Sequence, residues 1–532
     1  MQSLPTIIEP RDAVMTPRNA STLPATSHLS RNIIANFVGM FWTALMGPAL
    51  VAVYIRLMGI EAYGLVGIFT TLQAAFILLD LGLSTATNRE MARLSVREHH
   101  PEEARDLMRT TETVYWAIAV MIAAIVIGFA PLLAHRWIHA EHLSTGTIQQ
   151  AFLIMGVILA FQFPFALYAG GLMGLQRQVL LNAIIVSAAT VRGVGSVLLL
   201  WLVSPTIQVF FVWQLVATVL QTGATAFCLW CSLPDAATQP RFRRAVIRGL
   251  WRFSIGMMGI SFFALLLTQA DKVILSRLLT LEKFGYYALA TAAASSLLVI
   301  VGPIFTAVFP RFSQLVATDD HAALPRLYHR SCQLMSVAML PVAIILILFS
   351  PEILWVWTRN PVVAQNTHLL VSLLTIGTAL NGLMNVPYAL QLASGWIKLA
   401  LYQNIVAVVL LIPLLFWATN HYGALGAAAI WITVNAGYVL VGIQIMHTRL
   451  LHEEKRIWYT RDVGLPLAGA LSVALVGRWL FPTHASMPIT IGGLALVSLS
   501  TLAIASMLTP LTYGWLQMNV LPRRFAKEKP VD

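Results

Sequence analysis

Several ionisable side chains lie inside long apolar runs of this sequence, among them Arg192 at the middle of its run and Asp271 and Lys272 in the outer third of theirs. A charge at the centre of a membrane-spanning helix costs about 2.5 to 3.5 kcal/mol on insertion scales, so such residues usually face protein or water and often mark function. Arg192 could serve as a fixed cation that attracts a phosphate or a sugar acid. The alternative is a structural ion pair with Asp80 or Asp271.

Asp271 and Lys272 are consecutive, and consecutive helical residues point about 100° apart. We therefore expect that they do not simply neutralise one another, and that at least one faces a central cavity. Asp80 is expected near the cytoplasmic end of its span. It either hydrogen-bonds a helix end or takes up a proton or sodium ion and so couples transport to an ion gradient.

Uncharged polar residues and prolines add weaker candidates. Gln162, Asn381 and Asn385 are candidates for hydrogen bonding to a sugar. Pro164 and Pro387 lie at matched positions inside two spans, where each removes a backbone donor and is expected to kink its helix. They are hinge candidates for a rocking motion, with a packing role as the alternative.

Signals for a metal, a cofactor or catalysis are weak. The three cysteines, Cys228, Cys231 and Cys332, are too few for a disulfide framework, and no second pair or nearby histidine completes a zinc site. Histidines and a glutamate over 135–142 could bind a metal weakly, but we expect no specific role for them. Nucleotide and metalloprotease motifs are absent. The sequence predicts no catalytic residue, no metal and no cofactor beyond a coupling H⁺ or Na⁺.

Composition places these residues in an all-α polytopic membrane protein. The 532 residues are 58% hydrophobic and 11% charged, with a mean hydropathy of +0.76, which excludes a water-soluble enzyme and a disordered chain. A bilayer-spanning helix needs roughly 20 apolar residues. About fourteen runs qualify: 31–57, 64–87, 112–134, 148–173, 179–203, 206–230, 253–276, 285–309, 331–350, 367–392, 396–418, 423–447, 463–481 and 488–510.

The basic residues predict the orientation of these spans. Of the 34 Lys and Arg residues, only five fall in segments predicted to lie outside: Arg56, Arg136, Arg277, Lys283 and Arg359. Three lie inside spans and the others follow the positive-inside rule, which predicts that both termini are cytoplasmic. This topology accounts for the net charge of +12 without any nucleic-acid partner.

An internal repeat predicts two lobes. Arg, Leu, Glu and Gly of the stretch 56–65 recur in 277–286 at an offset of 221, Pro164 matches Pro387, and Asn182 matches Asn404. Six spans separate the copies, so both halves cross the membrane in the same direction, with the substrate path between them. Arg56 and Arg277, equivalent in this repeat, are expected at the outer rim.

The predicted organisation follows from the spans and the repeat. It comprises a disordered cytoplasmic N-terminus 1–30, an N-lobe 31–230, a cytoplasmic connector 231–252, a C-lobe 253–447, a cytoplasmic loop 448–462, two appended spans over 463–510 and a basic cytoplasmic tail 511–532.

Five short segments resemble the polysaccharide transporter family of Wzx-like O-antigen flippases, within the multidrug/oligosaccharidyl-lipid/polysaccharide exporter superfamily: 56–64 (RLMGIEAYG), 79–82 (LDLG), 269–272 (QADK), 284–287 (FGYY) and 309–312 (FPRF). The resemblance implies alternating-access flipping of a polyprenyl-diphosphate-linked oligosaccharide across the bacterial inner membrane, through a cavity between two lobes. It also implies membrane lipids, a glycan polymerase and glycosyltransferases as partners.

Two other functions stay open. One is an exporter of drugs or of the cell-wall precursor with the same fold. The other is a membrane-embedded glycosyltransferase or polymerase, which needs catalytic residues on a sizeable outer loop. The longest predicted outer loop, about 351–366, carries only Glu352 and Arg359 as charged residues, so a transporter that is not an enzyme is favoured.

Overall fold

A computed structural model describes residues 39, 42–43, 46–80, 82–95, 101–235, 238–452, 454–482 and 486–509, with the side chains of 78, 101, 247–261, 264 and 397 left out. The described residues form helices joined by short turns, and the only β-pairing among them is an isolated bridge between His139 and Thr280. The predicted N-terminal segment 1–30 and C-terminal tail 511–532 lie outside the described residues.

The N-terminal lobe consists of seven helices in the described part of the chain. They are the Met46–Met58 helix, α2 (Ile60–Ile77), α3 (Leu83–Leu94), α4 (Pro101–Leu132), α5 (Thr145–Gly174), α6 (Gln178–Leu202) and α7 (Ile207–Ser232).

The C-terminal lobe begins with α8 (Arg244–Leu278). It continues with α9 (Leu281–Ser295), α10 (Leu298–Ala317), α11 (Ala323–Leu348), α12 (Ser350–Thr358), α13 (Pro361–Ala393), α14 (Ile397–Gly437), the π-helical turn η3 (Tyr438–Gly442) and α15 (Ile443–Leu450). The short α16 (Lys455–Ile457) and the π-helical turn η4 (Trp458–Gly464) lead into the appended helices α17 (Leu465–Leu480) and α18 (Met487–Met507).

The helices confirm a multi-pass membrane protein. Among the described residues, eleven helical segments are long and apolar enough to cross a bilayer. One of them, Lys398–Leu450, has 53 residues, and its backbone leaves the helical region at Gly423 (φ 58°, ψ −142°). It therefore covers two predicted spans. The total of fourteen spans stays a prediction.

The second predicted span, 64–87, is not continuous. α2 ends at Ile77, a 3₁₀ turn η1 (Leu78–Asp80) follows, and Gly82 adopts φ 75° before α3 begins. Glycine tolerates this left-handed conformation, which breaks the helix. The prediction of one uninterrupted helix was wrong because the hydrophobic pattern continues across a backbone break.

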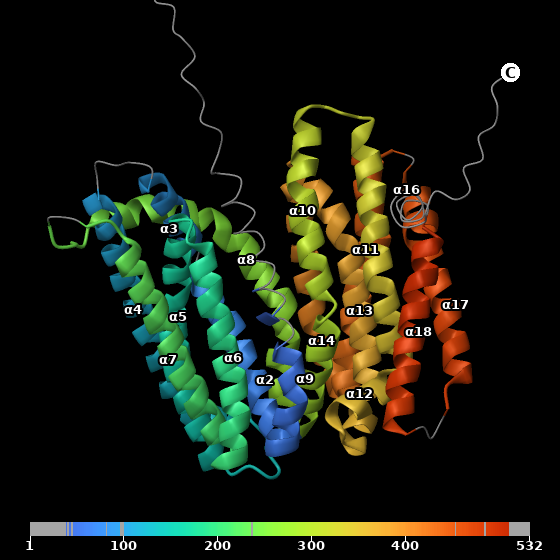
Figure 1. Cartoon of the computed structure of the whole chain (residues 1–532), viewed down its shortest axis with the longest axis horizontal. Helices are drawn as coiled ribbons and strands as arrows, with labels where there is room; N and C mark the ends of the chain where they lie inside the picture. The colour runs from blue at the N-terminus through green and yellow to red at the C-terminus, as the bar shows by residue number, and fades with distance from the viewer. Residues whose placement is uncertain are drawn as a thin grey trace, which may run out of the picture.

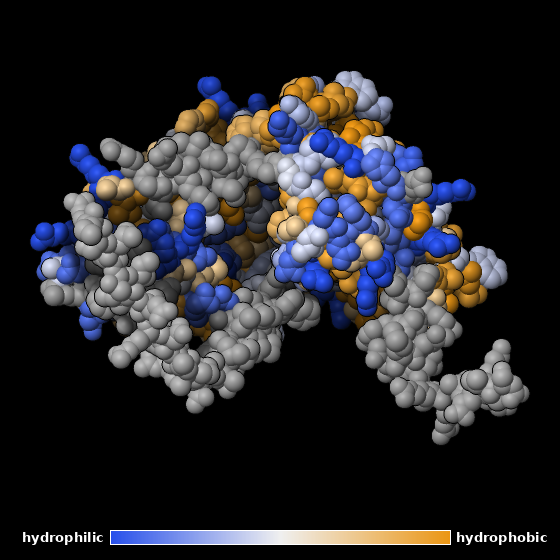
Figure 2. All heavy atoms as spheres, turned by 90° about the horizontal axis from the view of Figure 1, so that it is seen from above, coloured by the Kyte–Doolittle hydropathy of each residue, from blue (hydrophilic) through white to orange (hydrophobic). Residues whose placement is uncertain are grey.

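The two lobes form a V. In Figure 1, α4 to α7 lie on one side and α10 to α14 on the other, and the groups diverge towards the upper end of the view and meet at the lower end through α2 and α9. Seen from above, Figure 2 shows a recess between the two masses. We refer to these as the wide end and the narrow end. The wide end is the one predicted to be cytoplasmic.

Helix α8 connects the lobes. Its wide-end part lies over the N-lobe, against α3 and α4, whereas its narrow-end part packs against α14 and α2 (Figure 1). The segment that leads into α8 is tied to α4: the backbone N–H of Arg241 donates to Asp106 (2.6 Å), and that of Arg243 to Thr110 (2.9 Å). Arg243 also forms an ion pair with Asp106 at 2.5 Å.

The appended helices α17 and α18 pack on α11 at the edge of the C-lobe. Small residues of both, Ala470, Ala474 and Ala505, are buried against Ile344 and Phe349. Close packing of small residues is the usual basis of helix association in lipid. Arg478 of α17 adds an ion pair to Glu352 of α12 at 2.5 Å.

Candidate functional site

A central cavity lies where the two lobes meet. It consists of two adjoining spaces of about 330 and 230 Å³ that share Thr70 of α2, Lys272 of α8 and Thr291 of α9. Thr70 and Thr291 are separated by the repeat offset of 221 residues. The cavity is therefore lined by equivalent positions of the two lobes, with Lys272 in the wall of both spaces.

Asp271 and Lys272 form a small charged network beside this cavity. Lys272 Nζ donates to the carbonyl of Thr268 (2.6 Å) and lies 3.4 Å from Asp271 Oδ1, while Tyr287 donates to Asp271 Oδ2 (2.6 Å). The expectation that the two do not neutralise one another was wrong, because the long lysine chain folds back along its own helix. An ammonium group has three donors, and these contacts use two of them.

Arg192 lies away from the central cavity. Its guanidinium donates to Gln221 (2.6 Å) and to Thr218 (3.4 Å), both on α7, so it joins α6 to α7. Neither Asp80 nor Asp271 is among its partners, which corrects the predicted ion pair. The α6–α7 seam also holds a cavity of about 340 Å³ lined by Gln221. A role for Arg192 in the substrate path stays a prediction.

Asp80 acts at a helix end. Its carboxylate accepts hydrogen bonds from the hydroxyl (2.7 Å) and the backbone N–H (3.4 Å) of Ser84 in the first turn of α3, and from the Tyr115 hydroxyl. These contacts match the helix-end alternative. Carboxylates are stabilised at this position by the partial positive charge of the helix N-terminus.

The predicted amide and proline candidates lie in different surroundings. Gln162 of α5 accepts from Gln73 of α2 at 2.7 Å and so lies at a helix contact within the N-lobe. Asn381 and Asn385 lie on α13, where both line a separate cavity. Pro164 and Pro387 are buried inside the continuous helices α5 and α13, and their role as hinges stays a prediction.

The repeat builds the closed narrow end. A Cβ added to Gly64 of α2 would lie 2.5 Å from the carbonyl oxygen of Leu281, and one added to Gly285 of α9 would collide with the carbonyl of Ile60. Ile60 and Leu281 are themselves separated by 221 residues. The matched glycines thus let α2 and α9 cross in backbone contact. The glycine of each repeat lies against the backbone of the other repeat.

We expect Gly64→Ala to force α2 and α9 apart. Overpacking of a tight contact costs typically about 1 to 3 kcal/mol, so the purified variant should unfold about 1 to 3 °C below the wild type in a thermal scan. Gly128→Ala in α4 is the matched control, because an added Cβ there meets nothing within 4 Å. Equal melting temperatures for the two variants would contradict a tight α2–α9 contact.

The rim arginines reach across to the opposite lobe. Arg56 of the N-lobe donates to the carbonyls of Thr358 (2.7 Å) and Trp357 (3.0 Å) at the end of α12. Arg277 of the C-lobe lies 3.4 Å from His139 and stacks over Trp137 of the N-lobe. These contacts place both residues at the narrow end. Their guanidinium groups help to hold the lobes together there.

The loop after α4 completes this closure. The N–H of Leu281 in the C-lobe donates to the carbonyl of His139 at 2.7 Å. Glu61 of α2 accepts from the backbone N–H groups of Glu141 (2.6 Å) and His142 (3.0 Å), which fixes the loop. We call the Gly64–Gly285 crossing, the rim arginines and this loop the narrow-end gate.

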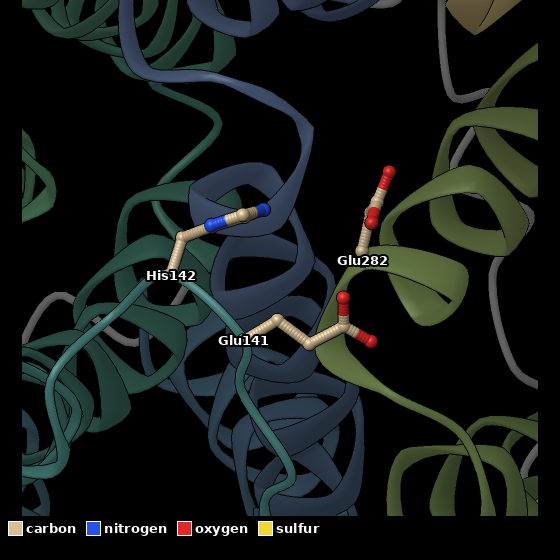
Figure 3. A group of neighbouring side chains, drawn as sticks. All are labelled: Glu141, His142 and Glu282. Carbon is tan, nitrogen blue, oxygen red and sulfur yellow. The ribbon is translucent and has the colours of Figure 1, made fainter.

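Three possible metal ligands meet at the gate. Figure 3 shows Glu141 and His142 of the loop beside Glu282 of α9, and their ligand atoms lie within 4.8 Å of one another. Glu282 accepts a hydrogen bond from Tyr286 at 2.8 Å. Glu141 and His142 are exposed, and Glu282 is partly so. Sequence spacing identified the loop but missed Glu282, because that residue comes from the other lobe.

The wide end holds a larger cavity of about 570 Å³ between α3, α4 and the start of α8. Three arginines and three acidic residues line it, namely Arg89, Arg93, Arg243, Glu90, Glu103 and Asp106. Arg93 pairs with Glu90 at 3.2 Å and Arg243 with Asp106 at 2.5 Å. This lining is mixed in charge.

A comparison with known families decides the classification. The profile of the family described as polysaccharide biosynthesis protein matches residues 29–316, more than half of the chain. The chain belongs to this family. A second profile, MatE, matches residues 257–417.

Two relatives are transport proteins. The chain is 22% identical over 405 residues to a protein of Shigella flexneri named putative O-antigen transporter, covering 75% of this chain and 93% of the relative. It is 23% identical over 449 residues to the succinoglycan biosynthesis transport protein ExoT of Rhizobium meliloti strain 1021, covering 81% of this chain and 82% of the relative.

Solved structures support the fold of this family member. The lipid II flippase MurJ in an inward closed conformation matches with a TM-score of 0.69 at 14% identity, over 92% of this chain and all of that one (100%). An inward-facing multidrug resistance MATE transporter matches with a TM-score of 0.61 at 14% identity, over 76% of this chain and 94% of that one. Both matches support the two-lobe fold.

Several site residues were not predicted from the sequence. Tyr287, Thr70 and Thr291 were missed because a hydroxyl in an apolar run gives no charge signal. The matched Gly64 and Gly285 were noted as part of the repeat, but their contact was not. Extending the repeat alignment along α2 and α9 would have paired Thr70 with Thr291.

Proposed function

We propose that this protein flips a polyprenyl-diphosphate-linked oligosaccharide, a precursor of surface polysaccharide, across the bacterial inner membrane by alternating access. The carrying observation is the central cavity at the lobe interface, where Lys272 presents a cation between equivalent threonines of the two lobes. A diphosphate cannot cross hydrocarbon unaided, and a lysine supplies charge-assisted hydrogen bonds to its oxygens.

The arrangement of the lobes supports this cycle. The gate is closed at the narrow end and the lobes diverge at the wide end. With the wide end cytoplasmic, as the positive-inside rule predicts, this conformation receives substrate from the cytoplasm, and both termini lie there. The polyprenyl tail stays in the lipid while the polar head enters between the lobes.

We also propose a driving force for transport and the enzymes that use the flipped glycan. An H⁺ or Na⁺ gradient, or the membrane potential, drives the return of the empty carrier, and Asp80 and Asp271 are the candidate carboxylates. The flipped glycan passes to a polymerase or a glycosyltransferase.

Deletion of the gene in its native host tests this function. We expect surface polysaccharide to be lost while the complete lipid-linked oligosaccharide accumulates in the membrane, shielded from impermeant reagents outside the cell. Plasmid-borne wild type should reverse both effects. An incomplete lipid-linked unit would instead indicate a glycosyltransferase. Normal polysaccharide with impaired ethidium efflux would indicate drug export and contradict the proposal.

A further inference from the structure

A second cavity in the C-lobe is lined by amides and tyrosines. It measures about 180 Å³ and lies between α13, α14 and η3, with Asn381, Asn385, Tyr388, Gln403, Asn404 and Tyr438 in its lining. We call it the amide pocket. Among the described residues, no lysine, arginine, histidine or carboxylate lines it. An uncharged ligand that both donates and accepts hydrogen bonds matches this lining.

The repeat provides an internal comparison, because the equivalent amides of the N-lobe contact other side chains or backbone of that lobe. Gln162, the counterpart of Asn385, accepts from Gln73 of α2. The C-lobe position equivalent to Gln73 is Ala294, which has no side-chain donor. The α9 side chain at this position therefore cannot engage Asn385, whose amide nitrogen donates only to the carbonyl of Asn381 at 3.0 Å among the described residues.

The second pair of equivalent amides differs in the same way. Asn182 of α6 is packed closely against Gly39, which precedes the Met46–Met58 helix. Asn404 instead lines the amide pocket, where it accepts a hydrogen bond from Tyr438 at 3.2 Å. The pocket is thus a surface that is covered in one lobe and open in the other.

One polar group of the pocket has no partner. Gln403 Nε2 is buried and has no hydrogen-bond partner among the described residues. A buried unpaired donor costs about 1 to 3 kcal/mol, so such groups call for an explanation. Its carboxamide lies against Gly442, where an added Cβ would be 2.6 Å from Nε2. This nitrogen has almost no accessible surface, so it does not face the open space of the pocket.

The amide pocket lies along the same helix face as the central cavity. Leu374 and Thr378 of α13 line the central cavity, and Asn381, Asn385 and Tyr388 line the amide pocket. Spacings of three and four residues place these positions on one face. At 1.5 Å per residue, Asn385 lies about 10 Å along the helix from Thr378, towards the wide end.

We infer that the amide pocket is a subsite for a neutral hexose or N-acetylhexosamine unit of the lipid-linked glycan, an inference that rests on the proposed function. The amides of Asn385 and Asn404 bind sugar hydroxyls, and the rings of Tyr388 and Tyr438 supply apolar contact. Phe305 of α10 stacks on Tyr388, with centroids 6.3 Å apart, and supports it. A diphosphate at Lys272 places its attached sugars within reach of this pocket.

Binding to the full-length protein in nanodiscs tests the inference. The probes are undecaprenyl diphosphate alone and the same lipid bearing glucose, galactose or N-acetylglucosamine. We expect at least one sugar-bearing lipid to bind about tenfold more tightly than the bare lipid, a gain of two or three hydrogen bonds. Asn385→Ala and Asn404→Ala should each reduce this gain about two- to threefold and leave the affinity for bare lipid unchanged.

The repeat supplies matched controls. Gln162→Ala and Asn182→Ala make the same truncations in the N-lobe and should retain the sugar-dependent gain. The inference is overturned if no sugar-bearing lipid binds better than the bare lipid, or if the C-lobe variants keep the gain. Failure of the proposed function looks different, because the wild type would then not bind even bare undecaprenyl diphosphate. Melting temperatures identify any variant that fails to fold.

Discussion

Replacing Lys272 by alanine is expected to lower glycan export by about tenfold or more, because hydrogen bonds to charged groups contribute about 1.5 to 3 kcal/mol. Lys272 is the only basic residue that lines the central cavity in the described part of the chain. Asp271 accepts a hydrogen bond from Tyr287. The Lys272 ammonium directs one donor to Asp271 and one to the Thr268 carbonyl, which leaves its third donor for a substrate oxygen. Surface polysaccharide per transporter in the membrane is the measurement.

Lys283→Ala is the matched control for this prediction. It makes the same truncation on an exposed residue of α9, outside the central cavity. Lys272→Arg should retain part of the activity, since it keeps the charge but changes its shape and reach. Full export by Lys272→Ala, at wild-type protein level, would show that Lys272 does not contact the diphosphate.

A disulfide across the narrow-end gate should stop transport reversibly. His139 of the N-lobe and Thr280 of the C-lobe form an isolated parallel bridge. Bridged backbones lie about 4.8 Å apart, within the range of Cα separations that a disulfide spans. In a background of Cys228→Ser, Cys231→Ser and Cys332→Ala, we expect His139→Cys with Thr280→Cys to reduce export at least about tenfold when oxidised, because the gate cannot open.

Reduction with dithiothreitol should restore export, and each single-cysteine variant should be insensitive to oxidant. A gel-shift assay with a thiol-reactive polymer would report the fraction cross-linked. Undiminished export from a fully cross-linked protein would contradict the alternating opening of this gate. The experiment therefore tests the mechanism independently of which glycan is carried.

The gate and the amide pocket show how one repeated sequence produces unlike surfaces. Gly64 and Gly285 make reciprocal contacts because α2 and α9 cross at the pseudo-symmetry axis. Asn182 and Asn404 also match, yet Asn182 is packed against Gly39 and Asn404 lines a cavity. Gln162 and Asn385 differ because Ala294 stands where the N-lobe has Gln73.

Residue types and their periodicity alone determined a large part of this description. Long apolar runs predicted the membrane helices, the repeat predicted two lobes, and the cost of an intramembrane charge directed attention to Lys272, which faces the cavity at their interface. These properties follow from transfer free energies and chain order, which do not depend on the partners of a side chain.

Only the tertiary structure decided which polar groups meet. Arg192 binds Gln221 of α7 instead of a carboxylate, Lys272 folds back to Asp271, and Glu282 joins Glu141 from the opposite lobe. Helix rotation and crossing set these pairings, and both depend on packing between segments that lie far apart in the chain. A hydrogen bond forms or fails over about an ångström, a precision that hydrophobic periodicity does not contain.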